Sequence, residues 1–173
     1  MTSPIAPPGA QGAVRKAVQA YIAGGEVPLL GTVFLGPPRL IKGTDVFDGT
    51  QIKGQMSGAA AFLHFQHSAR VRAALGGATS GKKFVDYDVT LVLLFRSAQR
   101  ISDDVTADYD RLIDGCVALI EADRTLGTKG LIFEAGEGPF GIQVDADLPR
   151  DAGSGTLHWW TSIRFNVRQI ATT

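Results

Sequence analysis

The sequence predicts an α+β fold in which an antiparallel or mixed β-sheet carries two α-helices packed on one face. Segments 84–96 and 156–170 alternate apolar and polar residues, as half-buried strands do, whereas segments 12–23 and 102–127 place apolar residues at helical spacing. Long strands joined by turns favour antiparallel pairing, and two helices cover only one face of a sheet. The other face is expected to be solvated or to meet a partner.

Length and composition predict a single domain over residues 12–173, preceded by a flexible arm at 1–11. The chain has 173 residues, of which 45% are hydrophobic, and 17 basic side chains balance 17 acidic ones. Its single cysteine, Cys116, leaves no disulfide framework and no cysteine zinc site, which favours a reducing compartment. Neither a leader peptide nor an apolar run of membrane-spanning length is visible, so no membrane is expected as a partner.

The first two elements follow the Pro-, Gly- and Ala-rich arm. Apolar residues recur at helical spacing over 12–23, and Gly24-Gly25 supplies a stop. The apolar run 29–35 lies between prolines and glycines and is predicted to be a buried strand.

A long connection is predicted at 36–60, because six glycines and prolines precede Gly58. Loops of this length are uncommon in compact domains and are often functional or mobile. Its isolated apolar residues are expected to dock on the body of the protein or on a neighbouring copy. These candidate interface residues are Ile41, Val46, Phe47, Ile52 and Met56.

Strands are predicted next at 61–71 and 84–96. In the first, His64, Gln66, Ser68 and Arg70 are expected to share one face. The second has one fully apolar face, while its other face starts polar at Asp86 and Asp88 and ends apolar at Val92 and Leu94. One end of this strand is therefore expected to be covered on both sides.

The main core helix is predicted from a cap at Ser102 to a stop at Gly127. Cys116 lies within its apolar stripe and is expected to be buried. Strands at 131–135, 140–146 and 156–170 complete the order. In the last strand the adjacent Trp159 and Trp160 must point to opposite faces, so one enters the core and the other is a candidate interface residue.

Two patterns of nucleotide-binding sites fail in their context. Gly76-x4-Gly81-Lys82-Lys83 lacks the hydroxyl that binds magnesium, and a strand follows it. The segment 136–141 reads G-x-G-x-x-G, but a strand instead of a helix follows, so a glycine-rich hairpin is expected.

The sequence also shows no pattern typical of a metal site or of a catalytic site. Asp86-x-Asp88 and Asp145-x-Asp147 would bind a hard cation only if the two pairs met; cross-strand partners such as Arg164 or Lys82 are the expected alternative. The three histidines show no ligand spacing, and no serine lies in a nucleophile turn. The sequence therefore predicts no enzyme, no cofactor and no metal.

Charge is divided along the chain although the total is zero. Residues 1–100 carry 11 basic and 5 acidic side chains, residues 101–151 carry 4 and 12, and residues 152–173 carry 2 and 0. One interpretation of this division is that the charges simply face solvent. The other is that the acidic and basic regions are complementary, so that copies stack head to tail or bind a different ring. The expected basic surface, facing a partner or a lumen, comprises Arg70, Arg72, Lys82 and Lys83.

Several segments together resemble a known family. They are VRKAV at 14–18 leading into PLLG at 28–31, DYDVT at 86–90, YDRL at 109–112, and WTSIRFNV at 160–167. In organisation, residues 12–171 resemble the tail terminator proteins of long-tailed (siphovirus) bacteriophages and related minor tail and neck proteins. The long 36–60 connection and the Pro-rich arm depart from the shortest members.

The resemblance implies a structural virion protein of the tail and neck, assembled in the host cytoplasm. It would form a homo-oligomeric ring, expected to be a hexamer, that caps the tail tube, ends its polymerisation and joins the tail to the head-neck connector. Its partners would be the tail-tube protein and the connector protein, with at most transient contact with DNA in the lumen. The alternatives are a head-tail connector or tail-tube subunit, and a small-molecule-binding α+β enzyme.

Overall fold

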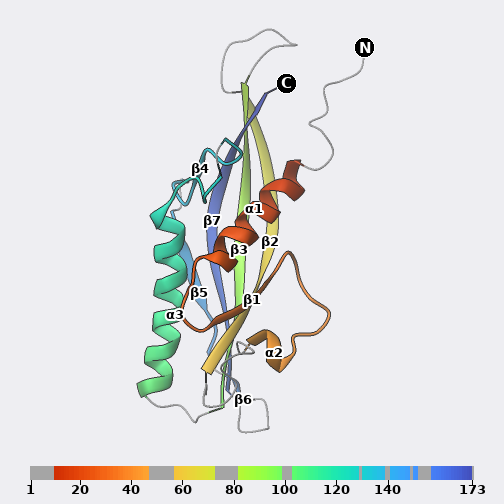
Figure 1. Cartoon of the computed structure of the whole chain (residues 1–173). Coiled ribbons are helices and arrows are strands. Elements are labelled where there is room, and N and C mark those ends of the chain that lie inside the picture. The colour runs from red at the N-terminus through yellow and green to blue at the C-terminus, as the bar shows by residue number, and fades with distance from the viewer. Residues whose placement is uncertain are drawn as a thin grey trace.

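The computed structural model describes residues 10–46, 57–72, 82–98, 103–128, 130–138, 141–148, 150–151 and 157–172. It confirms the α+β class: a mixed seven-stranded sheet carries its two long helices on one face (Figure 1). Some strand ends are described by their backbone alone, among them residues 67–72 and 82–83.

Three strands of 16 residues each form the centre of the sheet. They are β2 (Ser57–Arg72), β3 (Lys82–Ser97) and β7 (Leu157–Thr172), and β3 pairs antiparallel with both of the others. The β3–β7 ladder runs from Lys82 opposite Thr172 to Ser97 opposite Leu157 without a register shift. Because alternate residues point to opposite faces, this ladder determines the face of every side chain along both strands.

The alternation predicted for these strands is confirmed. In β3 the helix-covered face holds Val85, Tyr87, Val89, Leu91, Leu93 and Phe95, all buried. In β7 Trp159 is 7% exposed and Trp160 is 38% exposed, so the two rings do point to opposite faces. Leu94 and its register partner Ala60 are buried on the face away from the helices, which confirms that one end of β3 is covered on both sides.

The sheet is mixed because β1 (Leu30–Phe34) pairs parallel with β2. Parallel neighbours require a crossover connection of about a dozen residues or more, which explains the long segment between these two strands. That segment contains a helical turn, α2 (Gly43–Val46), against β1 and β2, and β2 already begins at Ser57. The expected 36–60 loop is corrected accordingly: small residues such as Ala59 and Ala60 belong to the sheet.

A β-bulge shifts the register of β2 between Phe65 and His67. Beyond it, Ser68 and Arg70 are register partners of Tyr87 and Val85, residues of the helix-covered face. The expectation that they share a face with His64 is therefore wrong, because one extra residue reverses the alternation.

The other edge of β7 carries three short strands, β4 (Glu134–Ala135), β5 (Gln143–Ala146) and β6 (Arg150–Asp151). Their partners on β7 follow in order, from Arg168 down to Leu157. The strands β4, β5 and β6 therefore all run in one direction, antiparallel to β7. Because β4 and β5 both pair with β7 and not with each other, the expected glycine-rich hairpin is wrong.

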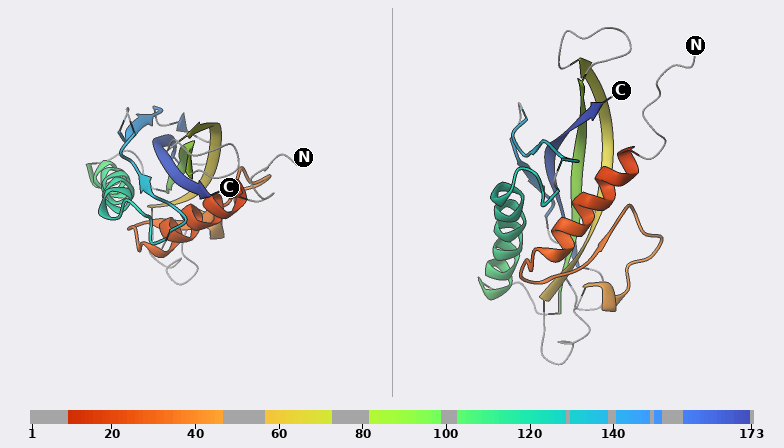
Figure 2. Two further views of the ribbon diagram at one scale, coloured as in Figure 1. Left: turned by 90° about the horizontal axis from the view of Figure 1, so that it is seen from above. Right: turned by 45° about the horizontal axis from the view of Figure 1, so that its top comes forward.

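Both long helices, α1 (Ala10–Gly24) and α3 (Asp103–Ala122), lie on the same side of the curved sheet (Figure 2). Their buried side chains join the core under β3 and β7, namely Val14, Val18 and Ile22 from α1 and Val105, Leu112, Cys116 and Ile120 from α3. The first helix begins at Ala10, so residues 10 and 11 belong to it and not to the expected arm.

The third helix ends at Ala122, five residues before the expected stop. Asp123 caps the following turn, since its carboxylate accepts hydrogen bonds from the backbone N–H groups of Thr125 and Gly127. Gly127 has φ +69°, a backbone conformation that glycine adopts without strain. The glycine thus ends the turn that follows the helix.

We expect Leu112→Ala to lower the free energy of unfolding by about 2–5 kcal/mol, because Leu112 is fully buried between α3 and the sheet. Urea denaturation of the purified protein measures the change. Leu148→Ala is the matched control: this leucine is 85% exposed, and its loss should change stability by less than about 0.5 kcal/mol. Equal losses for both variants would contradict the packing of α3 on the sheet.

Candidate functional site

The candidate site is the face of the sheet opposite α1 and α3, which we call the open face. Its side chains come from alternate positions of β3 and β7: Asp86, Asp88, Arg96, His158, Trp160, Arg164, Asn166 and Arg168. Two ends of this face differ in how their charges are paired.

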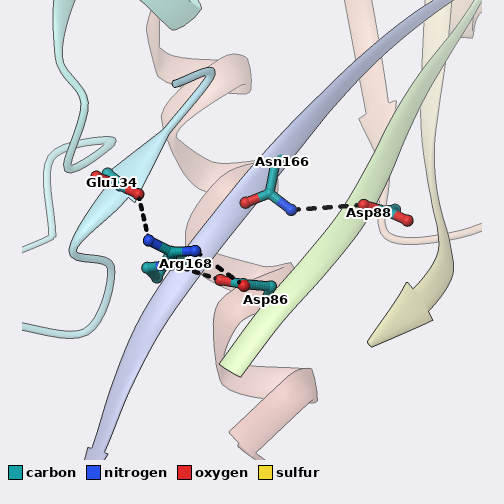
Figure 3. A network of polar contacts seen from close by, with 5 residues as sticks. All are labelled: Asp86, Asp88, Glu134, Asn166 and Arg168. Atoms are coloured by element: carbon teal, nitrogen blue, oxygen red, sulfur yellow. Dashed lines mark hydrogen bonds and ion pairs between the residues drawn. The ribbon is translucent and has the colours of Figure 1, made fainter. Parts of the chain in front are cut away.

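At one end Arg168 joins two carboxylates (Figure 3). Its Nε and Nη2 atoms donate to the two oxygens of Asp86 at 2.6 and 3.0 Å, and its Nη1 atom lies 3.0 Å from Oε1 of Glu134 in β4. The register explains this bidentate pair, because Asp86 and Glu134 are both register partners of Arg168. Hydrogen bonding to Asp86 raises the pKa of Arg168 above its usual value, so the guanidinium stays charged.

Two aromatic rings complete this end. The guanidinium of Arg168 lies over the ring of Phe84, 4.9 Å from its centroid, and the ring of Phe133 lies 5.9 Å from that of Phe84. Phe133 is 43% exposed, so the cluster leaves apolar surface next to a paired charge. We call Asp86, Glu134, Arg168, Phe84 and Phe133 the Arg168 cluster.

A small pocket lies beside the cluster. Asp88, Gly141, Gln143, Arg164 and Asn166 line it, and its volume is about 100 Å³. Asn166 Nδ2 donates to Asp88 Oδ1 at 3.4 Å. The glycine loop approaches β7 here: a Cβ atom on Gly138 would lie 2.7 Å from Cβ of Asn166, so only glycine fits.

The acidic pairs considered for a cation do not meet. Asp86 and Asp88 have Arg168 and Asn166 as register partners, whereas Asp145 is opposite Ser162, which lies four to six residues, or about 13–20 Å, further along β7. Asp86 is paired with Arg168 instead of the expected Arg164 or Lys82. Within the described ranges, no three histidine, cysteine, aspartate or glutamate side chains come close enough together to hold a metal ion.

The far end of the open face holds Arg96, His158 and Trp160. His158 is partly buried beside Arg96, and both the burial and that positive charge lower the pKa of His158 below its ordinary value of 6.5. Trp160 lies one position along the same face. Neither Arg96 nor His158 forms an ion pair with a described carboxylate.

The predicted interface residues fall into three groups. Val46 is fully buried, so it docks on the body of its own chain, and Ile41 is half-buried. Trp160 is exposed on the open face. Phe47, Ile52 and Met56 lie outside the described residues.

The predicted basic surface is described by its backbone only. Arg72 is the register partner of Lys83, and Arg70 is the partner of Val85, so these three positions share the helix side of the ladder. Lys82, the register partner of Thr172, is adjacent to Lys83 in the chain and is therefore a position of the opposite face of the sheet. All four positions lie at the end of the sheet that extends beyond α1 and α3, far from the beginning of α3 (Figure 1).

The acidic residues of α3 lie mainly on its solvent side. Asp103, Asp104, Asp110, Asp114 and Glu121 are exposed, as expected for a charged helix face. Cys116, on the opposite side of the helix, is buried, and its burial raises the pKa of the thiol to about 12. The expected burial of Cys116 is confirmed.

Comparison with known protein families and with curated proteins found no match to this chain. Among the described helices, none has the length and apolar character needed to cross a membrane. The geometry of the site therefore carries the argument about function.

Sequence reasoning missed the Arg168 cluster. A signal for it exists in the spacing: Asp86-x-Asp88 and Asn166-x-Arg168 are complementary pairs at the same i, i+2 separation in two alternating strands. Only the register brings them together, and a shift of four residues would have placed Arg164 opposite Asp86 instead.

We expect Arg168→Gln to lower the free energy of unfolding by about 1–3 kcal/mol, because it leaves Asp86 and Glu134 partly buried and unpaired. The side chain of Arg168 is 33% exposed, which places the effect below that of a fully buried pair. Urea denaturation measures it. Arg164→Gln removes the same charge from an exposed residue of the same strand, and an equal effect there would contradict the cluster's role.

We expect the free energy of unfolding to fall as the pH drops below about 6.5, because the folded state lowers the pKa of His158. In this pH range the imidazole of His158 binds a proton more readily in the unfolded state than in the folded state. Its contribution to stability is therefore complete only at higher pH. Urea denaturation between about pH 7.5 and 5.5 measures the slope. His158→Gln should flatten it, whereas His64→Gln, at an exposed position, should not; identical slopes for all three proteins would refute the assignment.

Proposed function

We propose that this protein is a structural virion subunit similar to a phage tail terminator. In this proposal it forms a homo-oligomeric ring, a hexamer, that caps the tail tube, ends tube polymerisation and joins the tail to the head-neck connector. Its partners are further copies of itself, the tail-tube protein and the connector protein, and its place is the tail and neck of the virion.

The observation that carries this proposal is the edge of β2. In the described part of the chain, β1 pairs with β2 only at positions 59–62, so positions 63–72 have no strand partner on that side. A long open edge binds a further strand readily. Such an edge supports assembly with other chains.

The opposite side of the sheet offers a complementary edge. All four residues of β5 are exposed, and β5 pairs only with β7 among the described strands. Contact between β2 of one copy and β5 of the next would use two different surfaces of the same protein. Contacts of this head-to-tail kind close into rings when the rotation between copies allows it.

The open face and the charge distribution also support the proposal of assembly with other chains. Trp160 is 38% exposed there, and exposed tryptophans are frequent interface residues. Acidic α3 lies apart from the end of β2 and the start of β3, whose positions Arg70, Arg72, Lys82 and Lys83 we call the basic tip, and this separation favours oriented contact with a charged neighbour. Contact of the basic tip with DNA in a lumen would be weak and transient.

A small-molecule enzyme is less well supported. A hollow of about 590 Å³ beside α3, lined by Pro28, Asp110 and Asp114 among others, is wide open to solvent. The pocket at Asp88 and Asn166 has a volume of about 100 Å³, whereas pockets for metabolites and drug-sized ligands occupy about 300–1,000 Å³. The titratable residues around it are also not arranged as a nucleophile with its base.

We expect the purified protein to form rings whose mass in light scattering is a multiple of 18.3 kDa, with six copies. Changing the exposed edge residues His64 and Gln66 both to Lys should prevent ring formation, because charges on an edge strand oppose pairing. Analytical ultracentrifugation would then show the monomer, with thermal unfolding unchanged.

The matched control changes Ala107 and Ala122 to Lys, at exposed positions of α3 away from β2. It adds the same charge and should leave the rings intact. A wild-type protein that stays monomeric at every concentration, with and without tail tubes, would refute the proposed function.

A further inference from the structure

Two arginines and a histidine lie in one row across the far end of the open face. Arg96 in β3 is the register partner of His158 in β7, and His158 is in turn the partner of Arg150 in β6. On the other side of Arg96 the register partner is Gly58, which is buried and contributes no polar side chain to the row. We call Arg96, His158 and Arg150 the cationic row.

The row has little negative charge to balance it. Within the described residues its one ion pair joins Arg150 to Asp147 at 3.7 Å, and both side chains are mostly exposed, at 75% and 59%. Such pairs contribute little to stability. Arg168, at the other end of the same face, has two carboxylates within 3.0 Å, so the contrast is not a general property of this face.

Arg96 supplies a second, independent observation. Its Nε atom is buried and has no hydrogen-bond partner among the described residues. A buried donor without a partner destabilises the folded state, and native proteins rarely retain one without a role for it. A bound group that accepts hydrogen bonds would satisfy this donor.

We propose that the cationic row is a binding site for a phosphate group. Two guanidinium groups beside an imidazole match the charge and the several acceptor oxygens of phosphate, and a guanidinium presents its donors in a fork that phosphate oxygens fit. Next to the row lie Ala60, Leu94 and Trp160, which are register partners in an apolar row of the same face. This apolar row lowers the local dielectric constant and strengthens the attraction of the cations for an anion.

The phosphate group has two possible sources, inorganic phosphate and the phosphodiester backbone of a nucleic acid strand. Trp160 is the side chain that distinguishes them. Its ring is 38% exposed beside the cationic row, where a base attached to the bound phosphate would stack on it. All three residues of the proposed phosphate site belong to one chain, so the site does not depend on ring formation. Phosphate binding can be tested with the monomer as well as with the ring.

The test titrates the protein with inorganic phosphate at constant ionic strength, with chloride as the balancing anion. Nuclear magnetic resonance follows the Nε–H signal of Arg96 and the ring signals of His158, with His64, about 20 Å away along the sheet, as an internal reference. Saturable shifts at Arg96 and His158, without shifts at His64, are expected.

Three variants identify the groups that bind. Arg150→Gln removes a mostly exposed charge that the fold does not need, and it should weaken phosphate binding about tenfold. Arg96→Lys keeps the charge but lacks the Nε–H donor and should weaken it similarly. Arg164→Gln, which removes one charge elsewhere on the open face, should leave the affinity unchanged; equal weakening by Arg164→Gln and Arg150→Gln would overturn the site in favour of general charge attraction.

A second arm replaces inorganic phosphate with a short single-stranded oligothymidylate. Tighter binding than that of phosphate, with a loss of affinity in Trp160→Ala, would identify a nucleic acid strand as the source. Equal affinity for both ligands and no effect of Trp160→Ala would identify free phosphate. Absence of any shift at Arg96 with either ligand would overturn the proposal.

Discussion

The unbroken antiparallel ladder between β3 and β7 is the constraint on which the rest of this structure depends. Each strand contributes 16 residues, and no bulge interrupts their pairing. Because side chains alternate strictly, one register assigns Phe95 and Trp159 to the core and Arg96, His158 and Trp160 to the open face. A slip by a single residue would exchange the two faces along the whole length of the ladder.

The same ladder produces two ends of the open face with opposite electrostatic character. At one end it places Arg168 against Asp86, and the edge strand β4 adds Glu134, so the charges are paired at close range. At the other end it places Arg96 against His158, and β6 adds Arg150. The first arrangement stabilises the fold, whereas the second leaves donors unused, and this difference motivates the proposed phosphate site.

The proposed assembly and the proposed phosphate site would use different parts of the sheet. The proposed ring depends on the β2 edge beyond position 62 and on the exposed strand β5, whereas the cationic row lies at the end of the face near β6. Loss of one function therefore need not affect the other. The basic tip, at the end of β2 and the start of β3, is a third region, at the opposite end of the long strands.

The sequence by itself determined the α+β class, the two faces of β3 and β7, the apolar stripe of α3 and the burial of Cys116. These features follow from periods of two or about four residues, which are local properties of the chain. It did not determine the parallel pairing of β1, the bulge after Phe65, the single direction of β4 to β6, or the partner of Asp86. All four depend on the register between segments far apart in sequence, and several registers satisfy the same alternation; only packing of the complete sheet against α1 and α3 selects one of them.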